Sequence, residues 1–428
     1  MRISILSCIA STLILGTQAL ALAASAAPSA NTQDLKLERV VMLMRHSVRP
    51  PTKDHPTPKG TTAQPWPAWS TPIGELTPHG EEGARLMGIY NRQLLATRGL
   101  LPANGCLGDA VSVWASGKSR AIKTAKSFVE GLAPGCGTTV SFPATENDDP
   151  VFHPLNSGAK IDGTLAKSAS LRRAPKGKLE EEIVAHNEEF KVLQRVMDCC
   201  APPVCSKNVA KEGCTIADLS SEIISGEEGK PALEGGLGMA STAAQTFLLE
   251  YVEGKPIAEV GWGRATKADI QKMLRFHTTK FFYEVRSPYV AERYAAPIAK
   301  RIVEALGEKS NKARLTLLAG HDTNVAALGG YFDLHWLPAD YPPDSLPPGG
   351  ALGFELLSNG KGETYVRAFF QTQSMDQLRN LTPLNQANPP AQVYIPIPGC
   401  GEKHDPTLCN FKTFQNIVNR KLTNPAKS

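Results

Sequence analysis

The chain has 428 residues, of which 42% are hydrophobic and 20% are charged, so its composition is that of a folded protein and excludes a largely disordered one. Its length predicts one large domain with an insertion, or two domains. The formal net charge of +5 is small and evenly spread along the chain, which argues against nucleic acid as a partner.

Residues 1–27 have the features of a secretory signal peptide. Arg2 precedes an apolar run that ends in ALALAASAA, where small residues offer several cleavage sites. The alternative is an anchor helix that stays in the membrane. No later stretch is apolar over the ~18 residues that a membrane span needs. We therefore expect a mature protein that is periplasmic or secreted and has no membrane contact.

The number of cysteines also favours an exported protein. Cys8 lies in the predicted signal peptide, and the eight others are an even number, which favours disulfides in an exported protein. We expect Cys106–Cys136 and Cys400–Cys409 as local pairs. The remaining four would pair among themselves in an order that the sequence leaves open; they are Cys199, Cys200, Cys205 and Cys214. A zinc site is the alternative, but adjacent cysteines lack the usual C-x-x-C spacing.

The first predicted elements are a strand, a long loop and a helix. Residues 37–44 form a short apolar run rich in β-branched residues, which predicts a buried strand that stops at Arg45-His46. Pro50 and Pro51 then force irregular structure, and we expect a loop as far as Pro72. Thr77-Pro78 followed by residues 80–95 predicts a capped helix with proline in its first turn.

The middle of the chain differs from both ends in its pattern of predicted strands and helices. Residues 111–114 predict a second strand, and residues 119–132 have helical periodicity. Residues 179–197 predict an amphipathic helix. We interpret residues 155–285 as a mainly helical insertion, because few strand patterns occur there.

The last part returns to alternating elements. We expect a helix over 290–306, a buried strand over 315–318 that ends at Gly320-His321-Asp322, and strands over 353–356 and 365–371. Alternating strands and helices predict an α/β fold whose sheet is largely parallel, with flanking helices. The core would comprise 33–154 and 286–428, and the insertion would form a cap domain.

The candidate catalytic and anion-binding residues lie at two strand ends. The first is Arg45-His46-Ser47-Val48-Arg49-Pro50. Ligands bind at the carboxyl ends of strands in open α/β sheets, and guanidinium groups bind phosphate oxygens by paired, charge-assisted hydrogen bonds. The same charges would keep His46 neutral and therefore nucleophilic. The alternative is a basic surface loop with an incidental histidine.

The second strand end is Ala319-Gly320-His321-Asp322-Thr323-Asn324. Gly320 allows a sharp turn, His321 can donate to a phosphate oxygen, and Asp322 can give a proton to a leaving alkoxide. The alternative for Asp322 is a cap of the helix that begins near Thr323, and it could do both.

Taken together, the two strand ends resemble the signatures of the histidine acid phosphatases, RHGxRxP and HD. This sequence has RHSVRPP and HDTN, and the similarity extends to WPAW, LTPHG, EGLAPGC, GWGR and PPGG. Within the family, the bacterial phytase and glucose-1-phosphatase group is the most similar. The resemblance implies a histidine phosphatase-like fold, a small phosphate monoester as substrate, and no metal or cofactor, because arginines supply the positive charge. We also expect a monomer.

The resemblance implies a role for each matching residue. His46 is the nucleophile, and Asp322 protonates the leaving oxygen and later activates water. His321 assists the clamp on the phosphoryl group, whose arginines are Arg45, Arg49 and Arg120. For Arg120 the alternative is a solvated residue in the first turn of a helix, although such a turn itself favours phosphate.

The match is incomplete at one position and extends further at others. Ser47 stands where the family usually has glycine, and the glucose-1-phosphatase branch also departs from glycine there, so Ser47 could alter how closely substrate approaches the loop. Positions that match phytase substrate contacts are Thr52, Lys53, His277 and Thr323. Lys53 could instead be an exposed loop lysine, and His277 a structural histidine on an amphipathic helix.

The expected function is that of a secreted acid phosphatase with a phosphohistidine intermediate, an acidic pH optimum and phytate as substrate. A glucose-1-phosphatase or a broad-specificity acid phosphatase is the alternative within the family. Outside it, the chain could be an exported binding protein for sugar or inositol phosphates, but the presence of both His46 and Asp322 argues against that. A phosphomutase is a further alternative, which an exported location disfavours.

Overall fold

In the computed structural model, the described residues are 35–145, 147–201, 204 and 214–427. Leu35–Ser428 form one compact unit. The predicted signal peptide and Cys205 lie outside the described residues. Within the described part, every helix is too short or too polar to cross a membrane.

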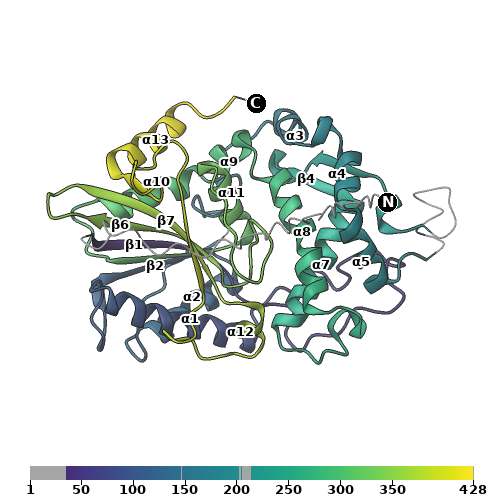
Figure 1. The fold of residues 1–428 in the computed structure, drawn as a ribbon, viewed down its shortest axis with the longest axis horizontal. Helices are drawn as coiled ribbons and strands as arrows, with labels where there is room; N and C mark the ends of the chain where they lie inside the picture. Colours follow the sequence, from purple (N-terminus) through teal and green to yellow (C-terminus); the bar gives the residue numbers. More distant parts are fainter. Residues whose placement is uncertain (1–34, 146, 202–203, 205–213, 428) are drawn as a thin grey trace, which may run out of the picture. The chain divides into compact units, whose positions relative to one another are not determined.

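The centre of the fold is a seven-stranded sheet with the order β2-β5-β1-β6-β7-β8, in which β9 also pairs with β7 (Figure 1). The pairs β1–β5 and β2–β5 are parallel, and the others are antiparallel. Four of the seven strands therefore run in one direction, which confirms the α/β class and shows that the sheet is mixed. The strands are β1 (Lys36–Arg45), β2 (Val111–Ala115), β5 (Leu315–Gly320), β6 (Ala351–Ser358), β7 (Thr364–Thr372), β8 (Ala391–Ile395) and β9 (Leu408–Asn410).

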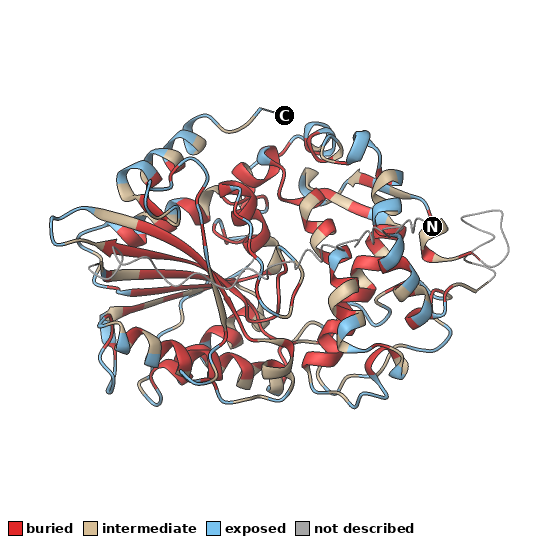
Figure 2. Ribbon diagram, in the orientation of Figure 1, coloured by how far each residue is buried: buried red, intermediate tan, exposed pale blue. Residues whose placement is uncertain are grey.

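Strand β1 is buried on both faces because helices cover both sides of the sheet (Figure 2). Its alternate residues Val40 and Met42 pack in one apolar cluster with α1 (Pro78–Thr97) and α2 (Ser119–Leu132). Val41 and Leu43 pack in another cluster with helices of the opposite face. Those helices are α9 (Pro288–Tyr294), α10 (Ala296–Gly307), α11 (Asp322–Phe332) and α13 (Phe411–Thr423); a short helix, α12 (Met375–Arg379), follows β7.

A third apolar cluster lies among the helices of the predicted insertion. This part also contains a two-stranded hairpin, which the sequence did not indicate. The division into a core and a cap remains a prediction, because the described residues form one compact unit. The elements are α3 (Gly163–Leu171), α4 (Leu179–Ala185), α5 (Asn187–Met197), β3 (Ser221–Ser225), β4 (Pro231–Gly235), α7 (Gly236–Val252) and α8 (Lys267–Glu284).

Two predicted helices are each broken into two. The helix expected over 179–197 stops at His186, whose Nε2 lies 2.9 Å from Thr279 Oγ1 on α8, so the chain turns to bury this ring. The helix expected over 290–306 breaks at Ala295, because Pro297 lies in the first turn of α10 and has no N–H to continue the preceding helix. The ends of the other predicted elements agree with the structure to within a few residues.

The local disulfides are confirmed. Cys106 is bonded to Cys136, and Cys400 to Cys409. Of the four cysteines whose pairing was left open, Cys199 and Cys200 are joined to each other, and Cys214 is also disulfide-bonded.

Helices α1 and α2 pack at short distance because each has a glycine at the contact. A Cβ atom at Gly88 would overlap the carbonyl oxygen of Phe128, and one at Gly131 would overlap that of Arg85. The contact therefore requires a bare backbone on both helices. It fixes α2, whose first turn carries Arg120, against α1.

We predict that Gly88→Ala lowers the free energy of unfolding by about 2 kcal/mol, since the added methyl group forces the two helices apart. Urea unfolding followed by circular dichroism measures the change. Gly360→Ala is the matched control, because no atom lies within 4 Å of a Cβ atom there. Equal stability of Gly88→Ala and wild type would show that the contact between the helices is not tight.

Candidate active site

The register of the sheet brings the two predicted strand ends together. Strands β1 and β5 are parallel, and Arg45 pairs with Gly320. The His46 N–H donates to the Gly320 carbonyl oxygen at 2.9 Å, and the Gly349 N–H donates to the His46 carbonyl oxygen at 3.2 Å. The rings of His46 and His321 lie with their centroids 5.6 Å apart. Residues 275 positions apart in the chain thus form one site.

The two nitrogens of the His46 ring have different surroundings. Its Nδ1 lies 2.9 Å from the Ser47 carbonyl oxygen. Because a carbonyl can only accept, the proton of the neutral ring is on Nδ1, and Nε2 keeps its lone pair. Burial, with the residue only 1% exposed, and then the charges of Arg49 and Arg45 hold the pKa of His46 well below its usual range. The imidazole is therefore neutral, as predicted.

Asp322 forms an ion pair with Arg45, whose Nη2 lies 3.1 Å from Asp322 Oδ2. Burial alone would raise the pKa of Asp322, but the charge of Arg45, with a smaller effect from Arg49, holds it well below its usual range. In the free site the carboxyl group is therefore ionised, which is the opposite of the state that a general acid needs.

The alternative role of Asp322 as a helix cap is wrong. His321 is the N-cap of α11, and Asp322 is its first residue. The His321 N–H donates to Asn324 Oδ1 at 2.9 Å, while Asp322 Oδ1 accepts only from the Thr323 N–H beside it, at 2.9 Å. Asn324 thus supports the turn, and the second carboxylate oxygen of Asp322 faces Arg45.

One hydroxyl group connects the His46 loop to the helix that carries Arg120. Thr124 Oγ1 accepts from the Ser47 N–H at 3.0 Å and donates to the Arg120 carbonyl oxygen at 2.8 Å. Arg120 lies in the first turn of α2, and its charge lowers the pKa of both His46 and His321. On the other side, Arg49 Nε lies 3.4 Å from His46 Nε2, and Arg49 Nη1 donates to the Pro50 carbonyl oxygen at 2.8 Å.

The four positions that match phytase substrate contacts differ in their surroundings. His277 on α8 is buried, with Nδ1 3.1 Å from Ser241 Oγ, and burial followed by the charge of Arg45 lowers its pKa to about 3. Thr52 and Lys53 are exposed on the loop after β1. Thr52 and Arg120 both lie within 4.0 Å of a Cβ position at Gly74. Thr323 is half-buried beside Asp322.

The Ser47 side chain lies close to α1 and to Gly349. Its hydroxyl oxygen lies 3.5 Å from a Cβ position at Gly83 on α1 and 3.9 Å from one at Gly349. The residue is buried with 1% exposure. The departure from glycine therefore fills a space between the loop and α1, and gives no support to a narrowed substrate entrance.

Sequence reasoning missed two residues behind His321. The Nε2 of His321 and the Nε2 of His153 each lie 3.1 Å from Ser116 Oγ. Ser116 directly follows strand β2, which was predicted, so its place at a third strand end could have been found. His153 lies in a segment without a regular element, and no sequence pattern marks it.

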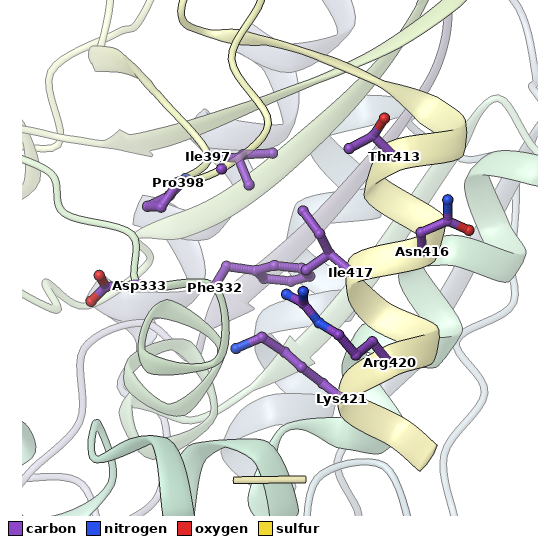
Figure 3. Close-up of a pocket in the computed structure, with 10 residues that line it drawn as sticks. Phe332, Asp333, Ile397, Pro398, Thr413, Asn416, Ile417, Arg420 and Lys421 are labelled. Carbon is purple, nitrogen blue, oxygen red and sulfur yellow. The ribbon is translucent and has the colours of Figure 1, made fainter. Parts of the chain in front are cut away.

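A separate cavity of about 460 Å³ lies between α13 and the end of α11 (Figure 3). Phe332 and Ile417 contribute apolar walls, and Arg420 and Lys421 lie at its rim. None of the predicted site residues lines it, so its size does not mark the chemistry. Among the described residues, no three His, Cys, Asp or Glu side chains are grouped to hold a metal ion.

The sequence profile of the histidine phosphatase superfamily, branch 2, matches residues 36–371. The chain belongs to this family. It is 34% identical to phytase AppA of Escherichia coli K12 over 90% of this chain and 92% of that protein. It is 27% identical to the glucose-1-phosphatase of Salmonella typhimurium, again over 90% and 92%. The structure of Hafnia alvei phytase in complex with myo-inositol hexakis sulphate is similar, with a TM-score of 0.84, 32% identity, and coverage of 92% of this chain and 98% of that one.

We predict that Thr124→Val lowers kcat/KM for p-nitrophenyl phosphate by about tenfold to a hundredfold, because it leaves the Ser47 N–H unpaired and separates the His46 loop from Arg120. Thr124→Ser keeps the hydroxyl group and is the matched control. Steady-state kinetics on both variants, with circular dichroism to verify folding, measure the effect. A Thr124→Val enzyme as active as Thr124→Ser would show that the hydroxyl group does not hold the site.

Proposed function

We propose that this chain hydrolyses phosphate monoesters through a phosphohistidine on Nε2 of His46. The observation that carries the proposal is the neutral His46, whose Nε2 is free of a proton and lies among arginine side chains at a shared strand edge. The proposed clamp on the phosphoryl oxygens consists of Arg45, Arg49, Arg120 and His321. Such positioning and neutralisation of charge are what phosphoryl transfer requires.

The reaction would proceed in two transfers. First, the Nε2 lone pair of His46 attacks phosphorus, the ester P–O bond breaks, and the leaving oxygen takes a proton from Asp322. Second, Asp322 accepts a proton from water, the water oxygen forms a bond to phosphorus, and the N–P bond breaks. Phosphate and the alcohol are the products, and His46 returns to its neutral form.

Substrate binding would give Asp322 the proton that it lacks in the free site. A phosphate dianion attracts the Arg45 guanidinium and adds negative charge close to the carboxylate. Both effects raise the pKa of Asp322 from its depressed value. Activity should therefore fall as pH rises through the pKa of Asp322 in the complex, which supports an acidic optimum.

Phytate is the substrate that we propose. The E. coli relative and the similar Hafnia structure are both named phytases. Lys53 is exposed on the loop after β1, where it could meet a second phosphate of a polyphosphorylated ring, and Thr52 and Arg120 both lie beside Gly74. His277 and Thr323 would contact the substrate from α8 and from the first turn of α11.

Glucose 1-phosphate is the second candidate, because glucose-1-phosphatases are also relatives. The replacement of glycine by Ser47 is the sequence feature that favours it. The Ser47 hydroxyl lies beside α1 and Gly349, however, so it has no direct way to select a sugar.

Export and a monomeric state belong to the same proposal. The signal-like sequence of residues 1–27 supports a periplasmic or secreted location. The disulfides Cys106–Cys136 and Cys400–Cys409 are what an oxidising compartment permits.

We predict phosphate release at mildly acidic pH with phytate as the preferred substrate over glucose 1-phosphate and p-nitrophenyl phosphate. His46→Ala should lower kcat by more than about 10³-fold, because it removes the nucleophile that forms the proposed phosphohistidine. Phosphate assays on the three substrates measure both results, with circular dichroism as the test of folding.

The outcomes of these assays separate the candidates. Preference for glucose 1-phosphate would keep the mechanism and change the substrate. An active His46→Ala would contradict the phosphohistidine. Binding of phytate without release of phosphate from any substrate would make the chain a binding protein.

We also predict that myo-inositol hexasulfate, whose sulfates stay ionised, binds with uptake of about one proton attributable to Asp322 near pH 4.5. The reason is that Asp322 is ionised in the free enzyme and its pKa rises in the complex. Affinity should therefore increase as pH falls. Calorimetry in buffers of different ionisation enthalpy measures the uptake.

Asp322→Asn is the control for proton uptake, because the histidines of the site could also take up protons next to an anion. The uptake should be smaller in Asp322→Asn than in wild type. Equal uptake by both proteins would contradict the proposed rise in the pKa of Asp322.

A further inference from the structure

We propose that His153 and Ser116 are positioning residues that fix the tautomer of His321, so that its Nδ1 carries the hydrogen offered to the substrate phosphate. This inference rests on the proposed function, in which His321 belongs to the phosphoryl clamp. It assigns the two residues that the resemblance to the family did not include.

The geometry is a short hydrogen-bonded chain. Ser116 Oγ lies 3.1 Å from His321 Nε2 and 3.1 Å from His153 Nε2. The His153 and His321 rings have centroids 5.4 Å apart, and His46 lies beyond His321 with a ring separation of 5.6 Å. The serine hydroxyl thus bridges the inner histidine of the site to an outer one.

The count of hydrogens limits the possible arrangements. A serine hydroxyl has one hydrogen and two lone pairs, so it can donate to only one of the two imidazoles, and at least one imidazole must donate to it. In the arrangement that we propose, His153 donates through Nε2–H and Ser116 donates to the lone pair of His321 Nε2. The hydrogen of a neutral His321 is then on Nδ1. Burial followed by the charge of Arg120 holds the pKa of His321 well below its usual range, so the ring is neutral.

Each arrangement in which His321 instead donates to Ser116 would oppose phosphate binding. It would place the hydrogen of His321 on Nε2 and leave a lone pair on Nδ1. That nitrogen is buried without a partner among the described residues, so it is the atom left for the substrate. A lone pair directed at anionic oxygens is repulsive, whereas an N–H is a donor to them.

Hydrogen bonds hold the backbone around Ser116, His321 and His153, so that the three side chains stay within reach of one another. The Ser116 N–H donates to the Ala319 carbonyl oxygen at 2.8 Å. Asn324 accepts from the His321 N–H at 2.9 Å and donates to the Phe152 carbonyl oxygen at 2.9 Å. One asparagine therefore fixes the inner histidine and the residue next to the outer one.

The segment that carries His153 is anchored by a buried carboxylate. Asp149 Oδ1 accepts from the Val151 N–H at 3.2 Å and from the Phe152 N–H at 3.0 Å. The His153 N–H donates to the Asp149 carbonyl oxygen at 3.0 Å. A turn built in this way gives the His153 ring a fixed direction without a helix or strand.

The test compares variants that keep or remove the outer donor. Ser116→Ala and His153→Phe break the chain. His153→Gln keeps an N–H at the position of Nε2 but cannot titrate, so it should rescue the function. Ser170→Ala is the matched control, because Ser170 is a fully buried serine on α3.

The first readout is the tautomer of His321 in the free enzyme, from nitrogen chemical shifts of ¹⁵N-histidine-labelled protein, with His321→Gln to assign the signal. We expect the Nδ1–H form in wild type, His153→Gln and Ser170→Ala, and a growing share of the Nε2–H form in Ser116→Ala and His153→Phe. The second readout is kcat/KM, which should fall by about tenfold in the two broken variants, the factor of one hydrogen bond.

Three results would overturn the inference: an Nε2–H tautomer in wild type, a tautomer unchanged by Ser116→Ala, or an equal loss of kcat/KM in His153→Phe and His153→Gln. The tautomer is measured without turnover. An enzyme without phosphatase activity would therefore refute the proposed function and leave the test of the hydrogen-bonded chain intact.

Discussion

The site depends on one register, in which Arg45 at the end of β1 pairs with Gly320 at the end of the parallel strand β5. A shift of one residue would turn alternate side chains to the other face of the sheet and separate the two histidines. The register is held because β1 is buried on both faces, between two apolar clusters. The packing of the core is therefore also what brings together the groups that we propose to be catalytic.

The arginines of the site concentrate positive charge there even when no substrate is bound. Arg45 is 1% exposed, and its ionic partner in the free site is Asp322. An unpaired buried charge is costly, so the carboxylate offsets part of the repulsion among the arginines. The same ion pair keeps Asp322 deprotonated. In the mechanism that we propose, an anion beside the guanidinium ends this state, and charge balance thus connects substrate binding to the protonation of the acid.

Much of this arrangement could be predicted from the sequence, because strand ends are visible as apolar runs that stop at charged residues. His46 and His321 were found in that way, and the sheet brings them together. The break at His186 and the cap by His321 could not be predicted, because both depend on side chains that meet only in the folded chain. His153 was missed for the same reason, since its partner Ser116 is 37 residues away.

The sequence and fold say more about the proposed mechanism than about substrate specificity, because the two depend on different parts of the structure. The groups that we propose to react stand at the ends of β1 and β5, where neighbouring strands hold the backbone on both sides. The groups proposed to select the substrate come from the loop after β1 and from α8, such as the exposed Lys53 and the buried His277. A loop side chain in solvent adopts many positions, so its residue type alone does not define what it binds. At a strand end, by contrast, backbone pairing fixes the position of each residue, so the chemical role of the residue can be derived from its position.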